Sequence, residues 1–202
     1  MATTMRQRLI SSTIALSVFG LAVTPVVASA ASNSANTTIN ANIGAAISIT
    51  TSSTVTISVT PTTGGVVSSS SDTVTVNTNE ALGYTLTLSS SDTNTNLVNG
   101  GDNIAAHSGT FGSPTTLGNN TWGYRIVGAG GFGGTAYSGE TNQGSSTSTW
   151  AGVPSSASPT TIKTTSSTAV NDTTTVWYGV KATASQPNGT YSDTVTYTAT
   201  SN

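Results

Sequence analysis

The chain has 202 residues, of which 6% are charged, carries a formal net charge of −2 at pH 7, and contains no cysteine. Five basic residues are too few to build the clustered patch that phosphate binding requires, so the composition excludes nucleic acid as a partner. The lack of cysteine excludes disulfides and cysteine metal sites, so packing and strand pairing have to hold the fold.

The first predicted element is a secretory signal peptide over residues 1–30. Arg6 and Arg8 precede a long apolar run, and residues 28–30 read Ala-Ser-Ala, as at a cleavage site. A retained membrane anchor is the alternative, but serine, threonine and proline dilute the run, so we expect no membrane span after cleavage. The mature chain, residues 31–202, has the length of a single domain.

Residues 37–50 are the first apolar segment of the mature chain. A glycine and two alanines interrupt the segment, which predicts a bent strand or two short strands, while a spacing of four also fits a helical turn. Because the segment is terminal, it could pair in its own sheet or be donated to the sheet edge of a neighbouring molecule. Its isoleucines occupy odd positions: Ile39, Ile43, Ile47 and Ile49.

Three further strands are predicted from strict alternation of apolar and polar residues. Residues 54–60 place valine and isoleucine on one face and threonine or serine on the other. Residues 72–78 and 82–89 follow with the same pattern. The sequence leaves open whether these last two pair as a hairpin or cross between two sheets.

The middle of the chain is richer in loops. Residues 90–120 contain few apolar residues, and residues 128–144 are rich in glycine. Between them, residues 121–127 predict a strand that points Arg125 away from the core. Residues 160–162 predict a brief further strand. The inward face of the strand over residues 121–127 would consist of Trp122, Tyr124 and Ile126.

The C-terminal region predicts a β-hairpin. Residues 176–182 and 191–199 both alternate, and Pro-Asn-Gly at residues 187–189 supplies a turn between them. Trp177 has the opposite parity to its buried neighbours, so it would be exposed or face a second layer. With about eight strands and no amphipathic helix, the chain is predicted to be all-β, an antiparallel β-sandwich or jelly roll.

The sequence contains no catalytic or cofactor-binding constellation that we can assign. His107 is the single histidine, which disfavours both a zinc site and a Ser-His-Asp hydrolase. Residues 92–96 carry oxygen-bearing side chains at every second position, which is the spacing at the start of a calcium-binding loop. A loop rich in Asx-turns is the alternative interpretation. A cross-link between an asparagine and Lys163 or Lys181 is a further hypothesis. The calcium candidates are Asp92, Asn94 and Asn96.

Aromatic residues give the candidate ligand-binding set. Exposed aromatic rings stack on sugars, so the chain could act as a secreted carbohydrate-binding module. We expect most of these rings to be in the core. The candidate residues are Trp177, Trp150 and Tyr137, with Trp122 as a further ring.

Several segments resemble secreted bacterial β-sandwich proteins. Residues 189–197, Gly-Thr-Tyr-Ser-Asp-Thr-Val-Thr-Tyr, are similar to the closing strand of spore-coat-U and pilin-like proteins. Residues 82–86 and 121–124 resemble segments of such surface proteins and of WxL-domain proteins. Unlike pilins, which usually carry a disulfide, this chain has no cysteine.

The resemblance implies a non-enzymatic protein of the cell envelope or of an appendage. We therefore expect a secreted or cell-surface structural or adhesive protein that self-associates by strand pairing. Its other expected partners are envelope proteins and cell-surface glycans. The carbohydrate-binding module remains the alternative.

Overall fold

The computed structural model describes residues 30–202, so the predicted signal peptide lies outside the described residues except for Ala30. The chain divides into two units, Met1–Asn42 and Ile43–Asn202. In the first unit, the described residues 30–42 form no strand or helix, and their side chains are exposed. All the regular structure of residues 30–202 lies in the second unit.

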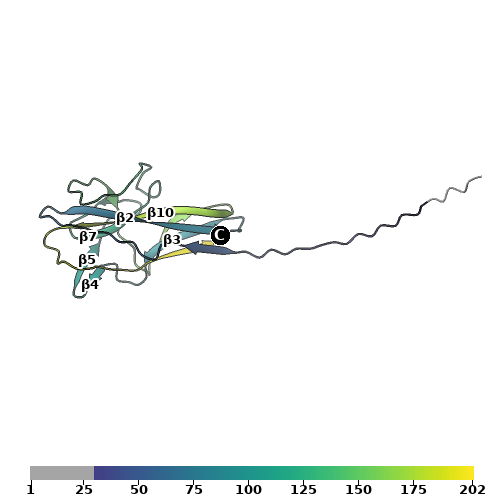
Figure 1. Cartoon of the computed structure of the whole chain (residues 1–202), viewed down its shortest axis with the longest axis horizontal. Coiled ribbons are helices and arrows are strands. Elements are labelled where there is room, and N and C mark those ends of the chain that lie inside the picture. The colour runs from purple at the N-terminus through teal and green to yellow at the C-terminus, as the bar shows by residue number, and fades with distance from the viewer. Residues whose placement is uncertain (1–29) are drawn as a thin grey trace, which may run out of the picture. The chain divides into compact units, whose positions relative to one another are not determined.

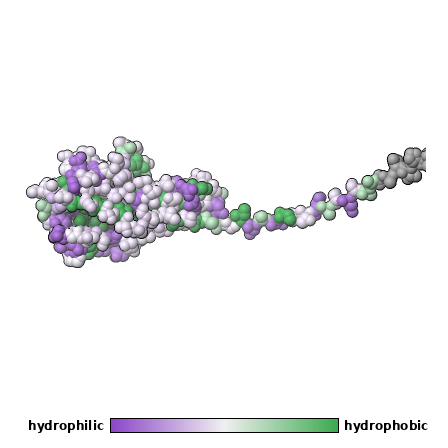
Figure 2. Space-filling model, viewed as in Figure 1, coloured by the Kyte–Doolittle hydropathy of each residue, from purple (hydrophilic) through white to green (hydrophobic). Residues whose placement is uncertain are grey.

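The prediction of an all-β fold is confirmed: residues 30–202 form eleven strands and no helix. Consequently no helix in this part of the chain is long and apolar enough to cross a membrane. The surface shown in Figure 2 is mostly of intermediate hydropathy, as a chain rich in Thr, Ser and Gly predicts. The strands are β1 (Ile47–Thr50), β2 (Val66–Thr78), β3 (Tyr84–Ser90), β4 (Leu97–Asn99), β5 (Asp102–Ala106), β6 (Thr115–Thr116), β7 (Thr121–Arg125), β8 (Thr149–Trp150), β9 (Thr160–Thr164), β10 (Ala169–Ala182) and β11 (Val195–Ser201).

The long strands β2 and β10 lie side by side in the larger sheet (Figure 1). They pair antiparallel from Ala182 opposite Val66 to Asp172 opposite Val76, and a register shift precedes the last pair, Ala169 opposite Thr78. β10 also pairs antiparallel with β7, but β5 pairs parallel with β7, so the expectation of a wholly antiparallel fold is wrong at this pair. The order β1-β2-β10-β7-β5-β4 makes a six-stranded sheet that curls into a half-barrel.

A three-stranded sheet, ordered β11-β3-β9, shares one core with the curled sheet, and β6 and β8 form a small separate pair. The sequence left open whether residues 72–78 and 82–89 form a hairpin or cross between two sheets. They cross, because β2 and β3 are consecutive strands of different sheets. Their apolar faces meet in the core instead of lying edge to edge. The fully buried members contributed by β2, β3, β7 and β10 are Val74, Val76, Tyr84, Leu86, Leu88, Tyr124 and Val176.

The predicted C-terminal hairpin is wrong. β10 pairs with β2 and β7, whereas β11 pairs with β3. Residues 183–194 carry the chain from one sheet to the other, so the two strands meet through side chains instead of through main-chain hydrogen bonds. The hydroxyls of Tyr178 and Tyr197 are 2.6 Å apart across this contact.

Two other strand predictions also need correction. Residues 37–46 form no strand, and the first strand is limited to Ile47–Thr50. Residues 54–60 keep the expected alternation but are not part of any sheet. Alternation gives a strand its two faces, whereas membership of a sheet requires a neighbouring main chain at hydrogen-bonding distance. The inward residues of the second segment, Val55, Ile57 and Val59, are half-buried against the core.

Candidate functional site

An open groove of about 800 Å³ runs along the inner face of the curled sheet. Residues 51–61 form its first rim, and residues 186–194 followed by the start of β11 form its second rim. The floor is apolar and belongs to β4, β5, β7 and β10. The floor residues are Leu97, Ile104, Trp122, Tyr178, Val180 and Ala182.

The first rim is held at both ends. At its start, the buried carboxylate of Asp72 accepts hydrogen bonds from the Thr51 hydroxyl and from the Ser52 amide, the latter at 3.0 Å. At its end, the Thr60 amide donates to the side-chain oxygen of Asn142 at 2.7 Å. These contacts fix where the rim leaves β1 and where it rejoins the larger sheet.

Between these anchors the main chain of the first rim is unpaired. Within the part of the chain that the structure describes, residues 53–59 make no backbone hydrogen bond to another segment. Their polar groups therefore depend on water, although the side chains on one face are half-buried. An extended segment in this state presents the same hydrogen-bonding pattern as the edge of a sheet.

The second rim is attached on its outer side. The Gln186 side-chain amide donates to the Tyr191 hydroxyl at 2.9 Å, which braces the beginning of this rim. Ser192 and Val98 exchange two main-chain hydrogen bonds, which attach the rim to β4, the last strand of the curled sheet. The half-barrel is thus closed on the β4 side and open toward the first rim.

One end of the groove is closed by a tyrosine pair. Tyr178 on β10 and Tyr197 on β11 share the 2.6 Å hydrogen bond, with Asp72 close by. Burial raises the pKa of Tyr178, and the neighbouring Tyr197 raises it further. Burial also raises the pKa of Tyr197, which outweighs its hydrogen bond with Tyr178. Both hydroxyls therefore stay neutral and join the two sheets at this point.

Beyond the tyrosine pair, β11 is an edge strand that pairs on one side only, with β3. The groove thus lies between an unpaired extended segment and the edge side of the smaller sheet. Seven residues, 53–59, span about 23 Å at the usual rise of a strand.

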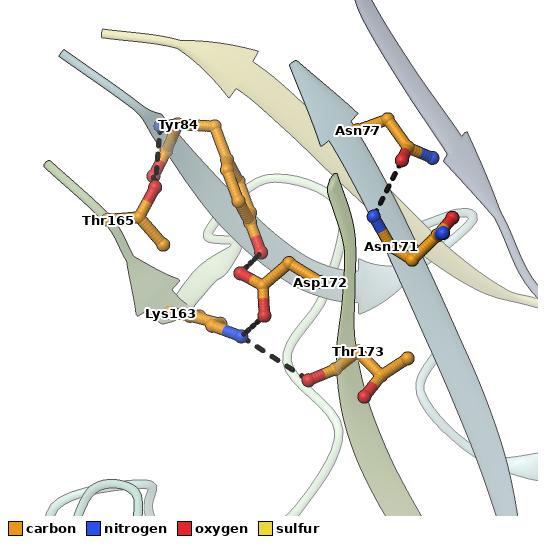
Figure 3. A network of polar contacts seen from close by, with 7 residues as sticks. All are labelled: Asn77, Tyr84, Lys163, Thr165, Asn171, Asp172 and Thr173. Atoms are coloured by element: carbon orange, nitrogen blue, oxygen red, sulfur yellow. Dashed lines mark hydrogen bonds and ion pairs between the residues drawn. The ribbon is translucent and has the colours of Figure 1, made fainter. Parts of the chain in front are cut away.

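A polar latch joins the two sheets away from the groove (Figure 3). Lys163 on β9 donates to the carboxylate of Asp172 on β10 at 2.6 Å, and the Tyr84 hydroxyl of β3 donates to the same carboxylate at 2.8 Å. Burial alone would raise the pKa of Asp172, but the hydrogen bonds from Lys163 and Tyr84 prevail and lower it. The carboxylate is therefore ionised and forms a salt bridge with Lys163. The lysine–asparagine cross-link stays a prediction.

The candidate ligand-binding residues gather on the outer face of β10, beneath the glycine-rich segment. Trp150 is fully buried, while Trp177 and Tyr137 are half-buried. The Tyr137 ring is nearly perpendicular to both tryptophans, at 87° and 88°. Trp150 offers no face to a ligand, and the three rings make no flat platform. Carbohydrate binding by Trp177 and Tyr137 stays a prediction.

Arg125 lies in the same cluster. It points away from the core as predicted, yet it is buried, because its Cζ sits 4.1 Å from the centre of the Tyr137 ring. Burial lowers the pKa of Arg125, and the nearby Tyr137 and Glu140 offset part of the decrease. Burial raises the pKa of Tyr137 to about 12. The cluster is a cation–π packing unit that holds the glycine-rich segment on the sheet.

The calcium candidates lie in consecutive Asx-turns. The Asp92 carboxylate accepts from the Asn94 amide at 2.7 Å, and the Asn94 side-chain oxygen accepts from the Asn96 amide at 3.1 Å. In residues 30–202 no three His, Asp or Glu side chains are grouped as metal ligands. The calcium site stays a prediction.

The single histidine packs in the loop region. His107 is buried, and its Nε2 lies 2.8 Å from the Thr115 hydroxyl. Burial lowers the pKa of His107, and its contact with Thr115 offsets only part of this. The ring is therefore a neutral packing residue of the loops.

Comparisons with known proteins give no relative for this chain: no family model, no curated protein and no solved structure matches it.

The sequence predicted that residues 54–60 of the first rim are extended, but it did not predict that they line a groove. The alternation of Val55, Ile57 and Val59 predicted a paired strand, and no local signal indicated that the partner would be missing. Asp72 is the first residue of the strand predicted over residues 72–78. Its buried carboxylate is instead what anchors the first rim.

Proposed function

We propose that this protein is an exported structural subunit of a cell surface or appendage and that it self-associates by strand pairing. The observation that carries the proposal is the groove, in which an apolar floor lies beside an extended segment with an unpaired main chain. Pairing a strand with this segment would satisfy its main-chain polar groups.

On this proposal the fold is a β-sandwich whose smaller sheet lacks one strand. The curled sheet supplies one layer, and β11, β3 and β9 supply part of the other. The first rim lies over the same core without pairing. A strand placed between this rim and β11 would extend the smaller sheet.

The place of action follows from the N-terminal sequence. Residues 1–30 have the features of a secretory signal peptide, so the protein acts outside the cytoplasm, secreted or on the cell surface. A cysteine-free core does not depend on the redox state of that environment. Other copies of the chain are the proposed main partners, with other envelope proteins as further ones.

Sedimentation of purified residues 31–202 over a range of concentrations tests self-association. We expect concentration-dependent oligomers, and electron microscopy of material released from the source cells should show filaments or a lattice. A protein that sediments as a monomer at every concentration and is released as free monomers would refute the proposal.

A further inference from the structure

We propose that Asn188 is a site of spontaneous covalent modification, at which its side-chain amide is lost and aspartate and isoaspartate are formed. The proposal goes beyond self-association and does not depend on it. It follows from an asparagine–glycine pair that the fold leaves exposed and without hydrogen bonds on the second rim of the groove.

The chain contains two such pairs, Asn99-Gly100 and Asn188-Gly189. A glycine after an asparagine has no Cβ to hinder the approach of the asparagine side chain to the next main-chain nitrogen. The sequence predicted a hairpin turn at the second pair. In the structure it is the first pair that lies at a hairpin, between β4 and β5, whereas the second lies in the connection between the two sheets.

The second pair is free between two fixed points. The Tyr191 hydroxyl donates to the Pro187 carbonyl at 2.7 Å and accepts from the Gln186 side chain at 2.9 Å, which holds the chain on either side. Asn188 and Gly189 are exposed, and in the described part of the chain neither takes part in a hydrogen bond. The Asn188 side chain can therefore turn back onto the Gly189 nitrogen without breaking a contact.

The first pair provides an internal comparison, because its asparagine is held. The main chain of Asn99 is paired with that of Asp102 in the β4–β5 hairpin. Its side chain packs closely on Gly189, where an added Cβ atom would overlap the Asn99 amide group. Asn99 has to leave both contacts before it can react, so its reaction should be roughly tenfold or more slower than that of Asn188.

The reaction needs water as its only co-reactant. The Gly189 main-chain nitrogen loses its proton and attacks Cγ of Asn188. A C–N bond forms, the bond from Cγ to Nδ2 breaks, and ammonia leaves, which gives a cyclic imide. Water then opens the imide at one of its two carbonyl carbons. Opening at Cγ gives aspartate, and opening at the main-chain carbonyl carbon gives isoaspartate.

Both products change the second rim. Each replaces a neutral amide by a carboxylate, which adds one negative charge beside the groove. Isoaspartate also adds a carbon to the main chain between Pro187 and Tyr191, whose side chain closes this stretch by hydrogen-bonding the Pro187 carbonyl. We expect isoaspartate to loosen that closure, so that a protease cuts within residues 186–194 faster than in the unmodified protein.

Mass spectrometry of the purified protein during storage at neutral pH tests the proposal. Cleavage after Lys181 releases residues 182–202, whose only asparagines are Asn188 and the C-terminal Asn202. This peptide should become about 1 Da heavier, and fragmentation should place the change and the isoaspartate at Asn188. The rate should rise with pH, because the attacking nitrogen has to be deprotonated.

Two variants and one unfolding experiment serve as controls. Asn188→Gln keeps the amide but would have to form a larger ring, so its peptide should stay unmodified over the same period. Asn188→Asp adds the charge without the extra main-chain carbon, so its rim should be cut more slowly than that of the isoaspartate form. In urea, where the hairpin no longer holds Asn99, the rates at Asn99 and Asn188 should converge. An unchanged Asn188 in the stored protein, or equal rates at the two asparagines in the folded state, would overturn the proposal.

Discussion

The two faces of β10 carry similar apolar surfaces but are covered in different ways. On the outer face, Tyr137 of the glycine-rich segment packs against Trp177 and against the fully buried Trp150. On the inner face, Tyr178 and Val180 form part of the floor of the open groove. The outer face is covered by segments that lie directly on it, whereas the inner face is covered by side chains of the first rim and of the smaller sheet, with the open groove between them.

Glycines explain why the outer cover fits so closely. A Cβ atom at Gly179 would lie 2.5 Å from the Trp150 ring, and one at Gly123 would lie 2.3 Å from the carbonyl oxygen of Ala151. Since glycine has no Cβ, the segment around Trp150 lies directly on the main chain of β10 and β7. The inner face has large side chains instead, and Tyr178 and Val180 are each only 6% exposed beneath the side chains that pack on them.

Removing the central ring of the outer cover should have the largest effect. Trp150→Ala deletes a fully buried indole and should lower the free energy of unfolding by about 3–5 kcal/mol in urea titrations. Trp177→Ala, which truncates a half-buried ring of the same cluster, should cost clearly less. Equal losses for both variants would contradict the central place of Trp150 in the outer cover.

Adding a single methyl group at the outer face should have the next largest effect. Gly179→Ala places a carbon against the Trp150 ring and should destabilise the fold by about 1–3 kcal/mol. Combined with Trp150→Leu, the loss should be less than additive, because the smaller side chain leaves room for the methyl group. Strict additivity in urea titrations would contradict the close contact.

Removing the Asp72 anchor should loosen the first rim, residues 51–61, on the inner face. Asp72→Ala leaves the Ser52 amide and the Thr51 hydroxyl without their acceptor, at a cost of about 1–3 kcal/mol. Limited proteolysis should then cut within residues 51–61 several-fold faster than in the wild type. Asp92→Ala, in a loop elsewhere, serves as the control. An unchanged cleavage rate at the rim would mean that Asp72 is not its anchor.

The polar latch should contribute least. Asp172→Asn removes the ion pair with the partly exposed Lys163 and should cost about 0.5–1 kcal/mol at pH 7. The folded-state pKa of Asp172 is lowered below its ordinary value of 3.8, so this contribution is present above pH 3.8 and is lost as the pH falls through the folded-state pKa. The stabilities of variant and wild type should therefore converge in strong acid. A difference that persists there would assign the loss to packing.

Much of the fold could be read from the sequence. Alternation assigned the inward faces of β2, β3, β7 and β10, and the lack of any helical period predicted an all-β chain. The opposite parity of Trp177 correctly indicated either exposure or a second layer, and the structure shows that it packs in a second layer with Tyr137. These features are local, because the burial of one side of an extended chain is written directly into its residues.

Pairing was decided by the tertiary structure. Residues 54–60 alternate as regularly as β3 does. However, β3 forms main-chain hydrogen bonds with a strand on each side, whereas residues 54–60 are not paired with any strand. Likewise β10 and β11 read as a hairpin but belong to different sheets. The main-chain groups that pair strands are the same at almost every residue, so the sequence determined which face of a strand is buried. Only the packing of distant segments determined which strand lies beside it, and which segment stays unpaired.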